Sequence, residues 1–362
     1  MALGLVLWAL VICSAVGTIA VFLDMQERRA AGGGRRMQRA MTRAETGLAD
    51  ALFGWTPGLL GRRILHPFDS LAIAAPGPVE PIWRGAIQRL NRGMFLVSVT
   101  ASDQAPPAIA TIATLSRLGW LVRVRPVPVP LRAALEAGAV RLGDGSRVDG
   151  TDAPPPPGGD CPEPDSALAG VTGGLIEPSG NVEIRGSPAI VRTGVDTGFP
   201  AGMVTAFDQL SSQASISLPG GSTWTTAPTL SGQECDVSDP GNWGDPSGTR
   251  GRCADFWPVV SVSGDVRIQN GIGQGILLVD GDLVIEGSFR FSGLILVRGR
   301  LEFGVVTTAF SLSGAMVVGQ VGSATAPLSG ISVTYSKCMV SNSLQSSGVL
   351  VPLRSRSWKQ LF

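Results

Sequence analysis

The chain has 362 residues, enough for two or three modest domains with a sizeable core. Charged residues make up only 16%, there are 48 glycines and 26 prolines, and the net charge is +1. This composition favours turns and short strands and excludes a broad basic surface for nucleic acid. With one histidine in the whole chain, we expect no enzyme, no catalytic residue, no cofactor and no metal site.

Residues 2–23 are uncharged, and a helix of that length, at about 1.5 Å per residue, crosses a hydrocarbon core of about 30 Å. The sequence thus predicts a long N-terminal transmembrane α-helix over residues 1–53. Gly32–Gly34 interrupt its middle and predict a hinge or a melted stretch. Beyond them, apolar residues at helical spacing predict that the helix resumes. The residues we expect to mediate assembly are Leu3, Leu7, Leu10, Met37, Met41, Ala44, Leu48 and Leu52.

The segment 26–52 resembles the N-terminal region of PilX-type minor pilins, through its arginines and the block Ala44-Glu45-Thr46-Gly47-Leu48. It departs from the family in two ways, since no basic leader precedes the helix and residues 3–7 contain no glutamate. The resemblance implies a minor pilin-like or pseudopilin-like subunit of a type IV pilus or related secretion filament. Its partners would be a membrane, other pilin or pseudopilin subunits and their assembly platform. Glu45 is the candidate charge partner for an arginine of a neighbouring helix.

Residues 54–150 predict a small mixed α+β region. Residues 93–101 and 118–130 have the composition of strands, and residues 131–141 predict a short helix that Gly138 ends. A run of prolines and glycines then predicts an extended linker over 151–164.

Residues 165–362 contain two interleaved series of five-residue units, with a period near 18 residues, each unit beginning with glycine. One series begins at Gly264, Gly281 and Gly299, and the other at Gly275, Gly293 and Gly314. Two strand-sized units per period predict a β-solenoid-like domain, with a β-sandwich as the alternative. The blocks 273–283 and 296–301, with the later Tyr-Ser-Lys-Cys at 335–338, resemble the C-terminal part of uncharacterised bacterial pilus-assembly-like proteins.

Four cysteines outside the N-terminal helix allow three disulfide pairings. Cys235 and Cys253 flank one loop and are the favoured pair, which leaves Cys161 with Cys338. A zinc site is the rival interpretation, but the chain has no Cys-x-x-Cys pair. Disulfides indicate an oxidising compartment. We therefore expect a single-pass inner-membrane protein whose β-rich region is exported to the periplasm or beyond, although the arginines after the helix favour a cytoplasmic flank.

A second functional class is a membrane-anchored envelope protein that binds a glycan or acts on a polysaccharide. Trp243, Phe256 and Trp257 could form a sugar-binding patch, or else a small core beneath a disulfide. The aspartates around residues 236–245 and 280–282 are those of ordinary solvated turns, with Ca²⁺ binding as the alternative. His66 stands in an apolar, proline-containing stretch and is expected to be structural.

Overall fold

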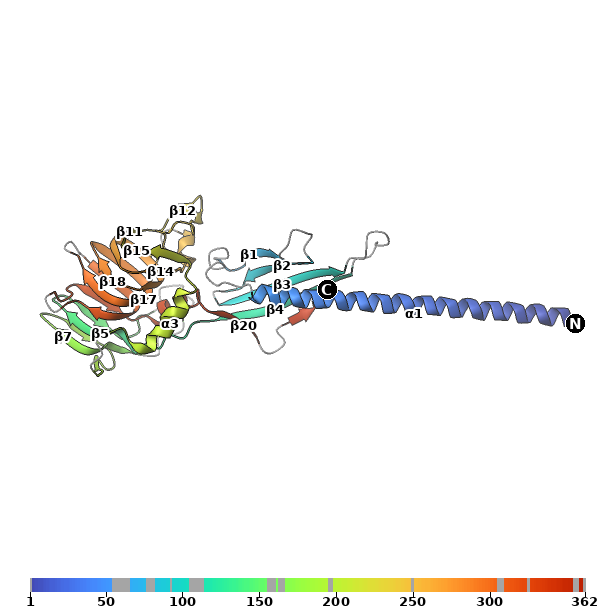
Figure 1. The fold of residues 1–362 in the computed structure, drawn as a ribbon, viewed down its shortest axis with the longest axis horizontal. Coiled ribbons are helices and arrows are strands. Elements are labelled where there is room, and N and C mark those ends of the chain that lie inside the picture. Colours follow the sequence, from blue (N-terminus) through green and yellow to red (C-terminus); the bar gives the residue numbers. More distant parts are fainter. Residues whose placement is uncertain are drawn as a thin grey trace.

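The computed structural model describes residues 2–53, 66–75, 82–91, 93–103, 114–154, 161, 167–194, 198–248, 251–304, 309–323, 326–353 and 358–360, and within 2–31 the side chains only of 14, 18 and 21–27. A long helix, α1 (Ala2–Phe53), projects from a small antiparallel sheet. A larger parallel sheet lies at the opposite end of the molecule (Figure 1).

Helix α1 is continuous, so the hinge expected at Gly32–Gly34 is wrong. Three glycines cost about 1 kcal/mol each relative to alanine, which weakens a helix without requiring a break. The transmembrane prediction is also corrected, because no helix in the described part of the chain is long and apolar enough to cross a membrane. Among the described side chains, the apolar run Val21–Leu23 ends at Asp24, and charged residues recur beyond it. The single-pass inner-membrane localisation loses its basis with this finding.

The antiparallel sheet packs against the C-terminal part of α1. Its strands run in the order β1-β2-β3-β4-β20, with β21 also paired to β4. Ala44 and Leu48 of α1 are buried against Trp83 of β2 and Val97 and Val99 of β3. The strands are β1 (Ser70–Ala74), β2 (Trp83–Arg89), β3 (Met94–Asp103), β4 (Thr114–Arg125), β20 (Val349–Pro352) and β21 (Trp358–Gln360).

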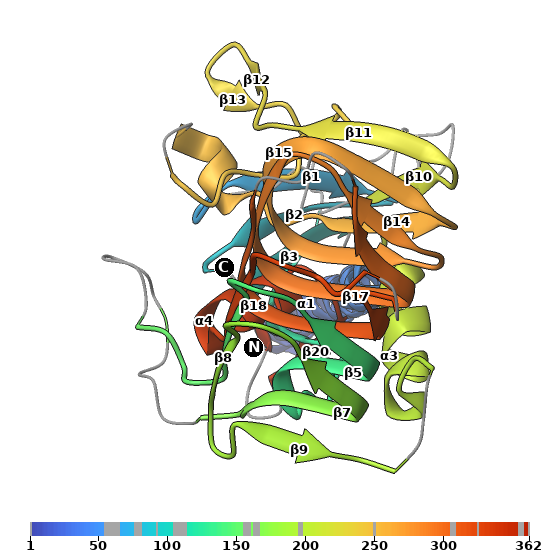
Figure 2. The ribbon, with the colours of Figure 1, turned by 90° about the vertical axis from the view of Figure 1, so that its left-hand side faces the viewer.

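The second sheet has thirteen strands, and its recorded pairings are parallel, which excludes the antiparallel sandwich for the described strands. In this sheet the chain winds in successive turns, which we call coils, and each coil stacks on the next (Figure 2). Strands from the earlier part of the chain are β5 (Ala133–Leu142), β6 (Arg147–Asp149), β7 (Ala169–Pro178), β8 (Glu183–Arg185) and β9 (Ile190–Arg192). The later strands are β10 (Ile216–Pro219), β11 (Ser222–Thr226), β14 (Val259–Ser263), β15 (Val266–Val279), β16 (Leu283–Ile285), β17 (Ser288–Phe303), β18 (Ala309–Val321) and β19 (Ile331–Thr334).

The repeated glycines lie opposite one another in this stack. Gly275 pairs with Gly293, and Gly293 pairs with Gly314. All three have positive φ angles of 106°, 131° and 148°. A Cβ atom on Gly293 would stand 2.1 Å from the carbonyl oxygen of Gly275, so the backbones approach too closely for any other residue. Each coil buries its apolar side chains against the next coil, as the row Leu277, Ile295 and Met316 illustrates.

The short helix predicted at residues 131–141 is instead strand β5, and Gly138 lies within it. This strand is paired on both sides, with β18 and with β7, so its pairing in the sheet overrides the helix propensity of its alanines and leucines. Strand β6 also belongs to the parallel sheet. Most of the linker predicted at 151–164 lies outside the described residues.

Two short helices pack against the parallel sheet. Helix α3 (Ala201–Ser211) packs beside β14 and β15, and helix α4 (Lys337–Leu344) packs against β15, β17 and β18. The remaining elements are the hairpin β12 (Leu230–Ser231) and β13 (Glu234–Cys235), and the 3₁₀ helix η1 (Gly251–Asp255).

Candidate functional site

The first candidate surface is the part of α1 that extends beyond the antiparallel sheet (Figure 1). Val21, Phe22, Leu23 and Met25 are each more than half exposed there. Adjacent large apolar side chains on a helix are costly to leave in water and mark an interaction surface. We call Val21, Phe22, Leu23 and Met25 the exposed apolar segment. Leu3, Leu7 and Leu10 fall in α1, but their side chains lie outside the described residues.

The assembly residues further along α1 divide according to their burial. Ala44 and Leu48 are buried in the seam with the antiparallel sheet, whereas Met37, Met41 and Leu52 are only half-buried. The glycine between Ala44 and Leu48 has a clear role, since a Cβ atom on Gly47 would come within 2.6 Å of the Trp83 ring. The Ala-Glu-Thr-Gly-Leu block therefore supplies a flat face on which the sheet packs.

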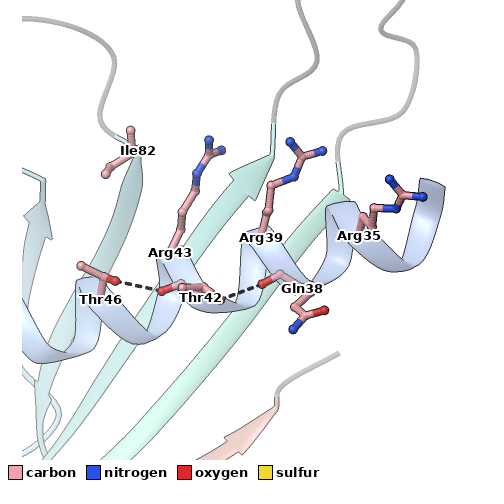
Figure 3. Close-up of a pocket in the computed structure, with 7 residues that line it drawn as sticks. All are labelled: Arg35, Gln38, Arg39, Thr42, Arg43, Thr46 and Ile82. Carbon is pink, nitrogen blue, oxygen red and sulfur yellow. Dashed lines mark hydrogen bonds between the residues drawn. The ribbon is translucent and has the colours of Figure 1, made fainter. Parts of the chain in front are cut away.

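An arginine-lined groove of about 680 Å³ runs along another face of α1 (Figure 3). Arg35, Arg39 and Arg43 stand four residues apart and project from the same side of the helix, with Ile82 opposite them. Arg43 Nη1 donates to the carbonyl oxygen of Ser102 at 2.8 Å, which ties the helix to the end of β3. The groove thus concentrates positive charge along one face of the helix, and that charge favours an acidic partner surface. The arginines carried the resemblance to PilX-type pilins and the cytoplasmic-flank expectation, and their four-residue spacing is the signal that places them on one face of the helix.

Thr42 and Thr46 line the same groove. The Thr42 hydroxyl donates to the Gln38 carbonyl oxygen, and the Thr46 hydroxyl donates to the Thr42 carbonyl oxygen, each at a distance of 3.0 Å. These bonds keep both hydroxyls close to the helix, whereas the guanidinium groups of the three arginines extend away from it (Figure 3). Glu45 lies on the same helix and is exposed. One helix therefore carries both signs of charge at positions that a neighbouring helix can reach.

The cysteines form two disulfides, Cys161–Cys338 and Cys235–Cys253, which belong to one of the pairings that the sequence left open. The second closes the loop that carries the aspartates near residue 240. Asn242 is fully buried beside it and donates to the carbonyl oxygens of Thr229 and Asp236. This loop is thus held by covalent and polar contacts.

The aromatic patch proposed for sugars is not on the surface. Trp243 is fully buried, donates to the Pro240 carbonyl oxygen at 2.9 Å, and packs edge-on against Phe289. Phe256 is also buried in the same core, next to the disulfide. Trp257 is only half-buried, and its ring nitrogen donates to Ala254. A stacking platform made by Trp243 and Trp257 together is therefore ruled out.

The other polar residues singled out from the sequence have structural partners. His66 Nδ1 lies 2.9 Å from Asp255 Oδ2, which joins the segment before β1 to η1. Asp236 accepts from Ser238 and Asp239 accepts from Gly241, as turn aspartates do. Among the residues that the structure describes, no three His, Cys, Asp or Glu side chains form a group that could hold a metal ion.

Scans against family models, curated proteins and solved structures found no match to this chain.

Proposed function

We propose that this protein is a structural subunit of a filament, minor pilin-like or pseudopilin-like, of a type IV pilus or related secretion machine. Helix α1 packs with the helices of neighbouring subunits, and the two sheets form the displayed head. The observation that carries this proposal is the exposed apolar segment on a helix that projects from the head (Figure 1). Each large apolar side chain that a neighbour buries contributes about 1.5–3 kcal/mol to association.

The charges along α1 support the same proposal. The arginine-lined groove faces outward on the helix, and Glu45 is exposed on it (Figure 3). In a bundle of such helices, Glu45 of one subunit pairs with an arginine of the next and sets the register between them. Opposite charges on facing helices choose partner and register more than they add affinity.

The head end of α1 supports it in a third way. Ala44, Gly47 and Leu48 pack closely on the antiparallel sheet, so the helix and that sheet share one core. A filament subunit of this kind is held to its neighbours by the helix and carries its head through this shared core.

The test places a photo-activated cross-linking amino acid at Phe22 in the full chain, expressed in its native cells. We expect a cross-link to the N-terminal helix of another subunit, either a second copy or a co-assembled one, identified by peptide mass spectrometry. The matched control carries the same group at Phe68, which is 73% exposed but lies outside α1. A Phe22 variant that cross-links only to lipid, to no protein, or to the same partners as Phe68 would contradict the proposal.

A charge exchange tests the register. We expect Glu45→Arg to reduce the Phe22 cross-link about fivefold, which corresponds to one ion pair of about 1 kcal/mol. Where the partner is a second copy of this chain, Arg35→Glu in the same chain should restore part of the cross-link, because the exchanged charges meet across the interface. If Glu45→Arg leaves the cross-link unchanged, Glu45 is not part of the interface.

A further inference from the structure

A cavity of about 540 Å³ lies where strands β5 and β7 meet the first turn of α3. Its size falls in the range of small-molecule pockets, about 300–1,000 Å³. Its walls carry two side chains that are each only 2% exposed, Glu136 and Thr172. Half of the other ten lining residues are glycines, and Thr193 and the half-exposed Arg132 are the remaining polar ones.

The two buried polar groups in this cavity are incompletely satisfied. Arg132 directs both its Nε and its Nη2 to one oxygen of Glu136, Oε1. The second oxygen, Glu136 Oε2, accepts no hydrogen bond from the residues that the structure describes, and the hydroxyl of Thr172 likewise has no partner among them. An unsatisfied buried polar atom destabilises the folded state, so two on neighbouring strands require an explanation.

Their position in the sheet makes the anomaly sharper. Leu278, Leu296 and Val317 form one row across the coils β15, β17 and β18, and all three are fully buried. Glu136 and Thr172 continue this row in β5 and β7. Apolar residues would extend the row at no cost in unsatisfied atoms. A violation of the local packing pattern of this kind is expected at functional sites.

The helix beside the cavity adds hydrogen-bond donors. Helix α3 begins after Pro200, and no side chain caps its first turn. Pro200, Ala201 and Gly202 all line the cavity, so the amide end of the helix borders it. The first amides of a helix have no partner within the helix and favour an acceptor.

These groups together select the charge of the ligand. The carboxylate of Glu136 is already paired with Arg132, so an added cation would leave an excess of positive charge. A free anion would meet the unshared oxygen of the same carboxylate. The site therefore suits a neutral molecule whose groups both donate and accept. A hydroxyl group does both, and a saccharide presents adjacent hydroxyls.

We propose that this cavity binds a neutral saccharide through adjacent hydroxyl groups. One hydroxyl donates to Glu136 Oε2, and its neighbour exchanges a hydrogen bond with Thr172 Oγ1 while accepting from the first turn of α3. This site is separate from the helix surfaces proposed for assembly and does not depend on that proposal. It also differs from the region around Trp243, whose side chain is fully buried.

The test is ligand-observed saturation-transfer NMR on the full chain with D-glucose and N-acetyl-D-glucosamine. The comparison ligands are glycine, a zwitterion with an ammonium and a carboxylate group, and acetate, an anion. Thr172→Val keeps the shape of the side chain and removes a hydroxyl that has no partner in the protein. It should therefore fold normally and weaken saccharide binding about tenfold. Glu136→Gln should weaken it tenfold or more. Ser116→Ala is the matched control, because Ser116 in β4 also carries a buried hydroxyl without a partner among the described residues, in the other sheet.

The expected result is a signal from at least one of the two sugars that is lost in Thr172→Val and Glu136→Gln and kept in Ser116→Ala. Binding of glycine or acetate in place of the sugars would overturn the ligand class. If neither sugar binds, or if sugar binding is unchanged in Thr172→Val, the proposed site is overturned.

Discussion

Gly293→Ala tests the account of how the coils stack. Gly293 lies between Gly275 and Gly314 in the column of glycines, with a φ angle of 131°. An alanine there has two faults. Its Cβ atom would stand 2.1 Å from the Gly275 carbonyl oxygen, and its backbone would occupy a region that L-residues rarely adopt.

Each fault makes its own contribution to the loss in the free energy of unfolding. Backbone strain of this kind costs about 1–3 kcal/mol, and forcing an extra methyl group into a packed stack costs about 1–3 kcal/mol more. We expect Gly293→Ala to lower the free energy of unfolding by about 3–5 kcal/mol. Gly264→Ala is the matched control, because Gly264 has a similar φ angle of 126° but the nearest heavy atom to its Cβ position is 3.4 Å away. That variant should lose only the backbone cost of about 1–3 kcal/mol.

The assay is urea unfolding of the full-length variants, followed by tryptophan fluorescence and by far-ultraviolet circular dichroism. The close approach between coils predicts that Gly293→Ala unfolds at clearly lower urea than Gly264→Ala. Equal losses in the two variants would mean that backbone conformation alone explains the glycines. A Gly293→Ala protein as stable as the unsubstituted chain would refute the stacking geometry itself.

Two further predictions concern the seam of α1 and the disulfide loop. Leu48→Ala should lower the free energy of unfolding of the antiparallel sheet by about 2–5 kcal/mol, because Leu48 is 1% exposed, and an unchanged urea midpoint would show that α1 does not pack there. Hydrogen bonds from the hydroxyl and then the amide of Ser238 lower the pKa of Asp236 from its ordinary 3.8, so Ser238→Ala should raise that pKa in an NMR titration of the carboxylate. Because the folded-state pKa is lowered, the stabilisation is complete above pH ~4 and disappears as the pH falls through the folded value, and a titration unchanged by Ser238→Ala would refute this cause.

Several features of the fold are readable from the chain alone because they depend on local spacing. The apolar spacing from Met37 to Leu52 is that of a helix face, and α1 reaches Phe53. The glycines at positions 275, 293 and 314 recur at 18 and 21 residues, and the same spacings separate their partners in the sheet. A repeat of this kind is visible because each coil meets its neighbour through equivalent positions.

Other features were decided by contacts between distant parts of the chain. Residues 133–142 have good helix formers, yet they form β5 because β18 and β7 offer hydrogen bonds on both edges. Strand β20 returns from the C-terminal region to pair with β4. The membrane prediction from residues 2–23 was wrong for the described part of the chain, where no helix is long and apolar enough to cross a membrane.

The candidate sites show the same division. The arginine face of α1 can be predicted from the sequence, because residues four apart share one face of a helix. The cavity lined by Glu136 and Thr172 cannot be predicted in this way, because these residues are 36 positions apart and become neighbours only through the register of β5 and β7. Periodicity within one element fixes which side chains share a face. Which faces meet depends on the free energy of packing the whole chain, and only the tertiary structure decides it.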